Sequence, residues 1–338
     1  MEDGPVGSKT CTKLSMKVKF NWKGTDDKFY GLKKLQFHSQ RADDTQMKER
    51  MGYYLFRSMG VPAPRSVHAR LLINGEFNGL FALTEQIDGR FTRLNFEDGE
   101  NNLYKEIWPV DQFGETYGEQ DYKDHLKTNE DENPSVALMM SFAEEISSAD
   151  VTDMPELINN WMDIDKITSY IVVDRTIKND DGVFHWYCSD GWCSSHNYYW
   201  YEDVEQNKIH LIPWDLDNSF ENIIEVENPW TQVVDPLGQI TANCEPFNAG
   251  PLMQRSASCD KLTSGWASFT EELNQKKSQL INGPMTAINT NRLIDKWSTQ
   301  IREATIEARN LHDDAVSLER WEEQVNELKL KLEYARNN

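Results

Sequence analysis

The fold of the first third of this chain is decided by residues 66–86, which read SVHARLLINGEFNGLFALTEQ. Two runs rich in apolar residues, Val67 to Ile73 and Phe77 to Gln86, flank the dipeptide Asn74-Gly75. Asn-Gly between two such runs is the strongest short-range indication of a tight turn between antiparallel strands. The stretch therefore predicts a β-hairpin.

The residues before this hairpin predict two more strands and a helix. Residues 13–20 alternate strictly between polar and apolar side chains, which is typical of a half-buried strand, and residues 31–38 form a second short strand. A helix is expected over residues 44–59, because Asp and Thr stand at its start and Gly60 and Pro62 follow its end. The first 105 residues are thus predicted to form a sheet with one helix.

The rest of the chain has a different character. Residues 110–134 are polar and lack periodicity, so we expect an exposed connection there. We assign residues 1–108 to a first, sheet-rich unit and residues 109–338 to a second, mostly helical unit, which together make an α+β protein. In the second unit, helices are expected over 136–146, 154–161, 164–178 and 316–336, and strands over 198–201 and 209–213.

Composition excludes several classes of protein. The 338 residues include 35 Lys and Arg against 56 Asp and Glu, a net charge of −21, and the mean hydropathy is −0.69. The longest apolar runs, such as Leu71-Leu72-Ile73, fall far short of the roughly 20 residues that span a bilayer. The negative charge argues against a surface that follows nucleic-acid phosphates and favours basic partners or metal ions. The 11 Trp indicate a folded core rather than an acidic disordered chain.

The five cysteines predict two local disulfides. Cys188 and Cys193 share one short Ser/Gly-rich segment, Cys244 and Cys259 flank another, and Cys11 is left unpaired. Neither pair has the Cys-x-x-Cys spacing of a zinc site. Because disulfides are typical of secreted proteins, we expect an extracellular or cell-surface protein, although no signal peptide follows Met1 and a cytoplasmic location is left open.

Two acidic clusters are the candidates for chemistry. Asp180-Asp181 follows the helix predicted over 164–178, and Asp215-Leu216-Asp217 follows the strand predicted over 209–213, with Asn197 between them along the chain. Nearby carboxylates repel one another and resist desolvation, so their convergence is best explained by a hard cation with oxygen ligands, Mg²⁺ or Mn²⁺. Each cluster taken singly also fits an ordinary turn, since Asp, Asn and Gly are turn formers.

These residues occur in the order that a kinase-like phosphoryl-transfer site requires. Such a site needs a strand Lys for the phosphates, a helix Glu that orients the Lys, an Asp at the attacking hydroxyl, and an Asn and Asp for the metal. The motifs Gly-x-Gly-x-x-Gly, His-Arg-Asp and Asp-Phe-Gly are absent. The candidates are Lys13 or Lys17, then Glu49, Asp181, and the metal ligands Asn197, Asp215 and Asp217, with Glu85, Gln86 and Ile87 as a hinge that contacts adenine.

At these positions the sequence resembles the spore-coat protein H (CotH) kinase family. The resemblance runs from about Ser8 to about Thr305, and its most specific parts are Pro213-Trp214-Asp215-Leu216-Asp217 and the Asn-Gly-Glu hairpin. The other matching pieces are Gly31-Leu32-Lys33-Lys34-Leu35, Asp44 with Met47-Lys48-Glu49, Met59-Gly60-Val61, Gly79-Leu80, Glu85-x-Ile87-Asp88, Leu103-Tyr104-Lys105, Asn179-x-Asp181 and Asn197-Tyr198-Tyr199.

The resemblance implies a bilobal, atypical protein kinase fold that transfers the γ-phosphoryl group of ATP, with Mg²⁺ or Mn²⁺, to Ser or Thr of proteins. Asp181 then matches the catalytic-loop Asp, Asp215 the metal-binding Asp, and Asn197 lies close to the metal-facing amide. Three features depart from the family pattern. Lys48-Glu49 replaces Arg-Glu, the opening is compressed to Gly7-Ser8-Lys9-Thr10, and the segment from Gly182 to Ser195 is longer.

Two other functions remain open at this point. A kinase-like scaffold without turnover would be a surface-binding or adhesive protein, and a kinase-like enzyme can also transfer AMP or form an acyl-adenylate. A calcium-binding module is disfavoured, because the region around Asp217 lacks a twelve-residue loop with a terminal Glu. For the kinase, the net charge of −21 favours basic Ser- or Thr-containing substrate segments, with no nucleic acid and no membrane span.

Overall fold

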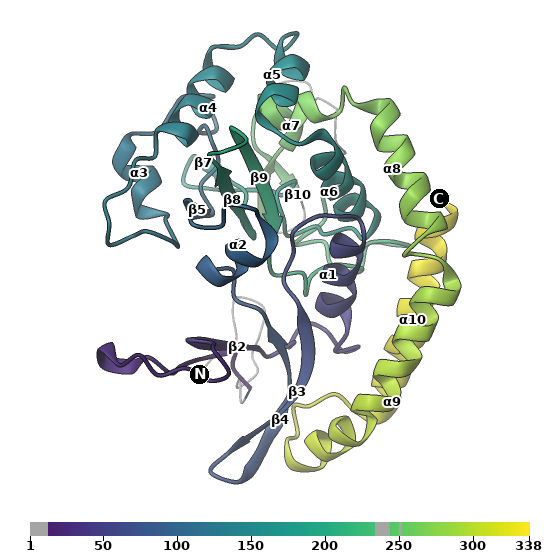
Figure 1. The fold of residues 1–338 in the computed structure, drawn as a ribbon. Helices are drawn as coiled ribbons and strands as arrows, with labels where there is room; N and C mark the ends of the chain where they lie inside the picture. Colours follow the sequence, from purple (N-terminus) through teal and green to yellow (C-terminus); the bar gives the residue numbers. More distant parts are fainter. Residues whose placement is uncertain (1–12, 234–243, 250–251) are drawn as a thin grey trace.

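A computed structural model describes residues 13–233, 244–249 and 252–338 (Figure 1). Two parts of the sequence on which predictions were made, Cys11 and the segment Gly7-Ser8-Lys9-Thr10, lie outside these ranges. The described residues form three antiparallel sheets surrounded by helices, so the predicted α+β class is confirmed. The division into units at residue 108 and the bilobal kinase-like arrangement stay predictions.

The first sheet contains the predicted hairpin. Its strand order is β1-β2-β4-β3, and all pairs are antiparallel. The turn residues Asn74 and Gly75 both have positive φ, 54° and 87°, as the Asn-Gly turn requires. The first strand is shorter than its alternating pattern of 13–20. The bounds are β1 Met16–Lys19, β2 Lys34–His38, β3 Ser66–Ile73 and β4 Glu76–Thr84.

Helices cover this sheet and connect it to the rest of the molecule. Helix α1 (Lys48–Ser58) lies within the range predicted for it, and α9 (Ala287–Leu311) packs along β4. Helix α9 pairs with α10 (Leu318–Asn337) along the side of the molecule that is drawn at the right of Figure 1. Four apolar side chains of this last helix are buried in the core: Trp321, Val325, Leu328 and Leu332.

The second sheet includes a strand from the first 105 residues. Its order is β5-β8-β9, formed by Leu103–Lys105, Tyr198–Asp203 and Lys208–Pro213. The prediction of a sheet with one helix for the first 105 residues was wrong in two respects. Strand β5 pairs with β8 rather than with the first sheet, and a second helix, α2 (Gly89–Asn95), is present. Its seven residues are too few for a helical periodicity, and its N-terminus is fixed locally by the Asp88 carboxylate, which accepts from the Arg90 backbone N–H at 2.9 Å.

The third sheet carries one of the two disulfides. Its order is β10-β11-β6-β7, and Cys188–Cys193 joins the paired strands β6 and β7, while Cys244–Cys259 lies beside β10 and β11. Both predicted pairings are therefore confirmed. The strands are β6 Trp186–Ser189, β7 Trp192–Ser194, β10 Phe247–Ala249 and β11 Leu252–Arg255.

The remaining helices surround a core rich in aromatic residues. Trp200 is fully buried, and Trp108 packs edge-on against it with ring centroids 5.2 Å apart. The stretch 110–134, predicted to be irregular, contains the short helix α3. No helix in the described ranges is both long and apolar enough to cross a membrane. The helices are α3 Glu119–Asp124, α4 Ala137–Ser148, α5 Met154–Trp161, α6 Ile164–Thr176, α7 Lys261–Trp266 and α8 Thr270–Asn282, with 3₁₀ turns η1 at Trp22–Gly24 and η2 at Ala257–Cys259.

A glycine allows α1 to approach the loop after β9 closely. A Cβ atom at Gly52 would lie 2.8 Å from Cδ1 of Leu216 and 3.5 Å from Cδ1 of Ile177. We expect Gly52→Val to lower the free energy of unfolding by about 1–3 kcal/mol through overpacking. Chemical denaturation measures this, with Ser58→Val at an exposed position of the same helix as the control. Equal losses for the two variants would contradict the close approach.

A partly buried histidine ties β3 to the segment before α1. His68 Nε2 donates to the Gln46 carbonyl at 2.7 Å, and Arg50 donates to His68 Nδ1 at 2.9 Å, so the ring is held neutral. Burial lowers the pKa of His68 to about 4, and the positive charge of Arg50 acts in the same direction. Because the folded-state pKa is lowered, the neutral ring's contribution to stability is present above the ordinary histidine pKa and is lost as pH falls through the window from 6.5 to about 4.

We therefore expect His68→Gln to make unfolding less sensitive to acid. Relative to this variant, the native protein should lose about 1.4 kcal/mol of stability per pH unit below the ordinary histidine pKa. Denaturation of both proteins over that range measures the difference. His125→Gln, at a partly exposed helix end, is the control, and parallel curves for the native protein and His68→Gln would contradict the prediction.

Candidate active site

The loop after α6 and the start of β8 bring Asp181 and Asn197 into direct contact. Asn197 Nδ2 donates to the Asp181 carbonyl at 2.8 Å and to its Oδ2 at 3.2 Å. The antiparallel β8–β9 pair places the next cluster beside them, since the Trp214 N–H donates to the Asn197 carbonyl at 3.1 Å. Asn197 and the Asp215 segment follow Asp181 by 16 and 34 residues in the chain, and the fold brings all three to one place.

Four side chains donate hydrogen bonds to the Asp181 carboxylate. His196 Nε2 lies 2.9 Å from Oδ1, Asn218 Nδ2 lies 2.8 Å from Oδ2, and the Tyr187 hydroxyl and Asn197 complete the set. Burial alone would raise the pKa of Asp181, but these bonds, led by that from His196, hold it below its ordinary value. Asp181 therefore stays ionised at neutral pH and is fixed in orientation.

The pKa values of Asp215 and Asp217 are shifted upward, whereas that of Asp181 is shifted downward. Burial, together with the charge of Glu49, raises the pKa of Asp215 to about 6. Burial also raises the pKa of Asp217, followed by repulsion from Asp215 and Glu49. Both residues thus experience an excess of negative charge, and Asp181 contributes to the repulsion on each. Such a site gains stability from a cation.

Backbone conformation at this site is also unusual. Asp215 has φ of 51° and Asn197 has φ of 62°, in the left-handed region that few non-glycine residues adopt. The Asp215 N–H bonds to the hydroxyl of Tyr53, a fully buried residue of α1, at 3.1 Å. Strained backbone of this kind concentrates at functional sites, where the surrounding structure holds it in place.

The donor set fits a divalent cation that also binds phosphate. Within the described ranges, no three Asp, Glu, His or Cys side chains lie close enough together to form a complete metal site by themselves. Mg²⁺ usually takes one or two carboxylates and fills its other positions with water and substrate phosphate oxygens. The carboxylates of Asp215 and Asp217, together with the amide oxygen of Asn197, would supply the protein's oxygen ligands to such an ion.

Glu49 is held by residues other than the two predicted lysines. Its fully buried carboxylate contacts His38 Nδ1 at 2.8 Å and accepts from the Thr84 hydroxyl at 2.9 Å. This contact with Glu49 raises the pKa of His38 above its ordinary value, although burial opposes the shift. The Nε2 atom of the same ring lies 2.7 Å from Nε2 of Gln36, so His38 links Glu49 to Gln36 inside the candidate site.

The predicted lysines lie in two different surroundings. Lys17 pairs with Gln36 in the β1–β2 register, so it points to the same face of the sheet as His38, two residues further along β2. Burial lowers the pKa of Lys17, as do the charges of Lys34 and Lys105. Lys13 instead lies 4.7 Å above the Phe81 ring and lines a cavity of about 520 Å³ with Asp43 and Asp217.

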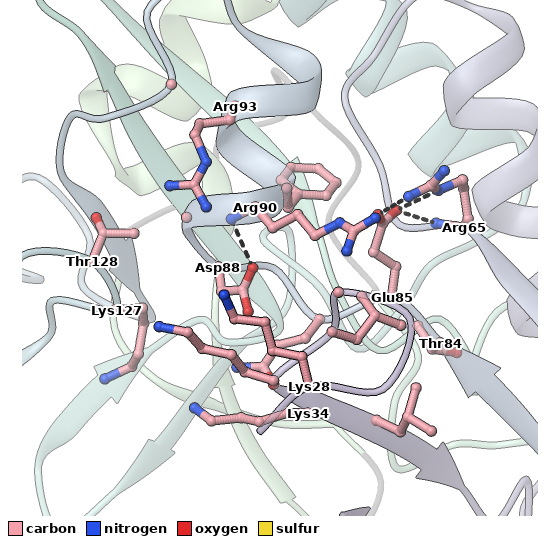
Figure 2. Close-up of a pocket in the computed structure, with 18 of the residues that line it drawn as sticks. Lys28, Lys34, Arg65, Thr84, Glu85, Asp88, Arg90, Arg93, Lys127 and Thr128 are labelled. Atoms are coloured by element: carbon pink, nitrogen blue, oxygen red, sulfur yellow. Dashed lines mark hydrogen bonds and ion pairs between the residues drawn. The ribbon is translucent and has the colours of Figure 1, made fainter. Parts of the chain in front are cut away.

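The predicted hinge residues follow β4. Glu85 forms an ion pair with Arg65, and the side-chain Oε1 of Gln86 is buried without a hydrogen-bond partner in the described part of the chain. Ile87 is buried in a small core with Phe91 and Trp214. Glu85 and Gln86 also line a second cavity of about 520 Å³, which Figure 2 shows.

Sequence reasoning missed several members of this site. His38, Tyr187, His196 and Asn218 contact its acids directly, and the charge of Lys105 lowers the pKa of Asp215. Two of them stand next to predicted residues, His196 before Asn197 and Asn218 after Asp217. Their position beside a candidate ligand was the available signal.

One curated protein gives a distant match to this chain. It is the inner spore coat protein H of Bacillus subtilis (strain 168), which is 19% identical over 207 residues. The match covers 59% of this chain and 53% of that protein. The chain thus spans about half the length of the curated relative it matches.

A family model described as CotH kinase protein matches residues 4–337, nearly the whole sequence. The match includes the loops that hold Asp181, Asn197 and Asp215, the helix α1 that holds Glu49 and the strand β2 that holds His38. The chain therefore belongs to the CotH kinase protein family.

Proposed function

We propose that this protein is a protein kinase that transfers the γ-phosphoryl group of ATP to Ser or Thr of proteins and requires Mg²⁺ or Mn²⁺. The observation that carries the proposal is the group of carboxylates from Glu49, Asp181, Asp215 and Asp217, in which burial and then mutual repulsion raise the pKa of Asp215 and Asp217. Phosphoryl transfer needs positioned charge more than strong acid or base chemistry. A metal ion bound here would neutralise charge on the phosphates.

Asp181 is the residue that would receive the attacking hydroxyl. Its lowered pKa keeps the carboxylate ionised, so it can accept a hydrogen bond from the substrate hydroxyl. Its hydrogen bonds from His196 and Asn218 fix the orientation of the carboxylate. In the transfer, the hydroxyl oxygen forms a bond to the γ-phosphorus, the bond to the β-phosphate oxygen breaks, and the hydroxyl proton passes to Asp181. Weak basicity is sufficient for this role because the transition state is loose.

Two lysines from neighbouring sheets are the candidates for holding the phosphates, and the charge of one of them, Lys105, lowers the pKa of Asp215. Lys17 lies on the His38 face of the first sheet, and its pKa responds to Lys105 at the end of β5. Together they would hold the phosphates that lie between the metal ligands and the sheet. The unpartnered Oε1 of Gln86 supports an adenine position at the hinge, because adenine offers an amino group as donor.

The compartment and the substrate belong to the same proposal. Two disulfides favour an oxidising, extracellular or cell-surface location. The curated relative is a spore coat protein by its name, which agrees with such a location. The net charge of −21 favours basic segments that contain Ser or Thr as substrates.

The test is transfer from ATP to a basic Ser-containing peptide with Mn²⁺, with Mg²⁺, and with a chelator. Mass spectrometry of the peptide and of the protein itself identifies the group added. Phosphate addition that requires the metal supports the proposal. An adenylate on the product would show AMP transfer instead. If the protein binds no nucleotide in the presence of metal, it is a binding protein without kinase activity.

A further inference from the structure

A basic pocket lies beside the hinge, in a protein whose net charge is −21. The pocket of about 520 Å³ is formed by the loop before β2, the start of α2 and residues 127–129 (Figure 2). Seven basic residues line it against the acids Glu85, Asp88 and Glu100. The seven are Lys28, Lys33, Lys34, Arg65, Arg90, Arg93 and Lys127.

Most of this positive charge is not neutralised within the molecule. Arg65 is paired with Glu85 and Arg93 with Glu100, while the Asp88 carboxylate caps α2. The other five basic side chains make no ion pair within the part of the chain that the structure describes. Elsewhere on this acidic protein the basic residues commonly pair with Asp or Glu, as Lys331 does with Glu227 and Glu327.

The floor of the pocket is apolar. Leu35, Val67, Leu83 and Phe91 contribute to its lining, and Val67 is 46% exposed although it lies in a strand. Figure 2 shows Lys28, Lys34 and Lys127 on one side of the pocket and the Arg65–Glu85 pair on the other. The unpaired lysines therefore lie along one side of an apolar floor instead of meeting at a single point.

We infer that this pocket docks an anionic segment of a protein, one that carries several carboxylates or phosphoryl groups spaced along the chain and at least one apolar side chain. Distributed rim charges match spaced anions, whereas a single phosphate group is bound best by converging donors. The pocket shares Glu85 and Gln86 with the proposed hinge, and the inference assigns to this place a partner of opposite sign to the basic substrate segments.

The probe is a fluorescein-labelled peptide of alternating glutamate, serine and leucine. Its binding to the full chain is measured by fluorescence anisotropy. The comparison peptide has lysine in place of glutamate. We expect only the glutamate peptide to bind, with an affinity that falls as salt is added. Binding of both peptides alike, or of neither, would overturn the inference.

The double variant Lys34→Glu with Lys127→Glu tests the location. We expect it to weaken binding of the glutamate peptide by at least about tenfold, which corresponds to about 1.4 kcal/mol. Arg292→Glu with Lys296→Glu makes the same change in net charge at exposed positions of α9 and should leave binding within about twofold. If both double variants weaken binding equally, the peptide is attracted by net charge alone and the pocket is not the site.

Three further measurements distinguish this inference from its competitors. Should Lys34→Glu with Lys127→Glu unfold, Arg90→Ala replaces it and is expected to weaken binding in the same direction. Asp215→Asn should bind the glutamate peptide as the native protein does, whether or not the kinase proposal holds. Displacement of the peptide by ATP without metal, or by an RNA oligonucleotide at equal charge, would assign the pocket to nucleotides or nucleic acid and overturn the inference.

Discussion

Replacing Asp215 by Asn is expected to lower metal-dependent phosphoryl transfer on the order of a thousandfold. Asn keeps the size of the side chain and one of its oxygens, but it removes the negative charge that a divalent cation needs. Incorporation of phosphate into a peptide substrate, measured with Mn²⁺ and with Mg²⁺, gives the loss of activity. Asp313→Asn, the same chemical change at an exposed position, should retain full activity.

The same substitution should raise the stability of the protein although it lowers the activity. Burial and the charge of Glu49 raise the pKa of Asp215 to about 6, so the folded state disfavours the ionised carboxyl at neutral pH. Because the pKa is raised, stability decreases as pH rises from the ordinary Asp value of 3.8 to about 6, and the loss is complete above that. Asp215→Asn removes this repulsion and should raise the melting temperature without metal.

Metal should then reverse the ranking of the two proteins. Mn²⁺ with an ATP analogue is expected to stabilise the native protein by mass action and to have little effect on Asp215→Asn. Thermal unfolding with and without the metal nucleotide measures both effects. If Asp215→Asn keeps native turnover, or if Mn²⁺ stabilises both proteins equally, Asp215 is not a metal ligand.

Local sequence determined the parts of the fold that depend on neighbouring residues. The Asn74-Gly75 turn, the alternating strand around Val18 and the helix stop at Gly60 each carry their own signal, and all three elements are present. Strand β5 and helix α2 are too short for such a signal. Whether Leu103–Lys105 joins the first sheet or β8 depends on which edge the chain meets, and no residue within the segment encodes that choice.

The same limit applies to the candidate site. Asp181 and Asn197 were predicted to converge, and they do, because each follows or precedes an element with a clear pattern. The contact of Glu49 with His38 could not be predicted, since it depends on how α1 lies over β2. A kinase-like template placed a lysine opposite Glu49, while the β2 register puts a histidine there. Residue type and order were available from sequence, but the face of each strand relative to the helix was not.

The contact between His38 and Glu49 should be worth about 3–5 kcal/mol when one partner alone is removed. In His38→Leu the fully buried Glu49 carboxylate keeps the Thr84 hydroxyl but loses its contact with the imidazole ring. Denaturant unfolding of His38→Leu, Glu49→Gln and the double variant measures the pair. We expect the double variant to be more stable than the sum of the two single losses predicts, because it leaves no unpaired buried charge.

The pH dependence of this coupling gives a second criterion. Contact with Glu49 raises the pKa of His38 against the opposing effect of burial, so the protonated ring favours the folded state. The contribution is complete below the ordinary histidine pKa of 6.5 and is lost as pH rises through the raised value. His38→Leu should therefore cost most in mild acid and least in alkali. His125→Leu controls for loss of a histidine, and additive single losses at every pH would show that His38 and Glu49 do not act as a pair.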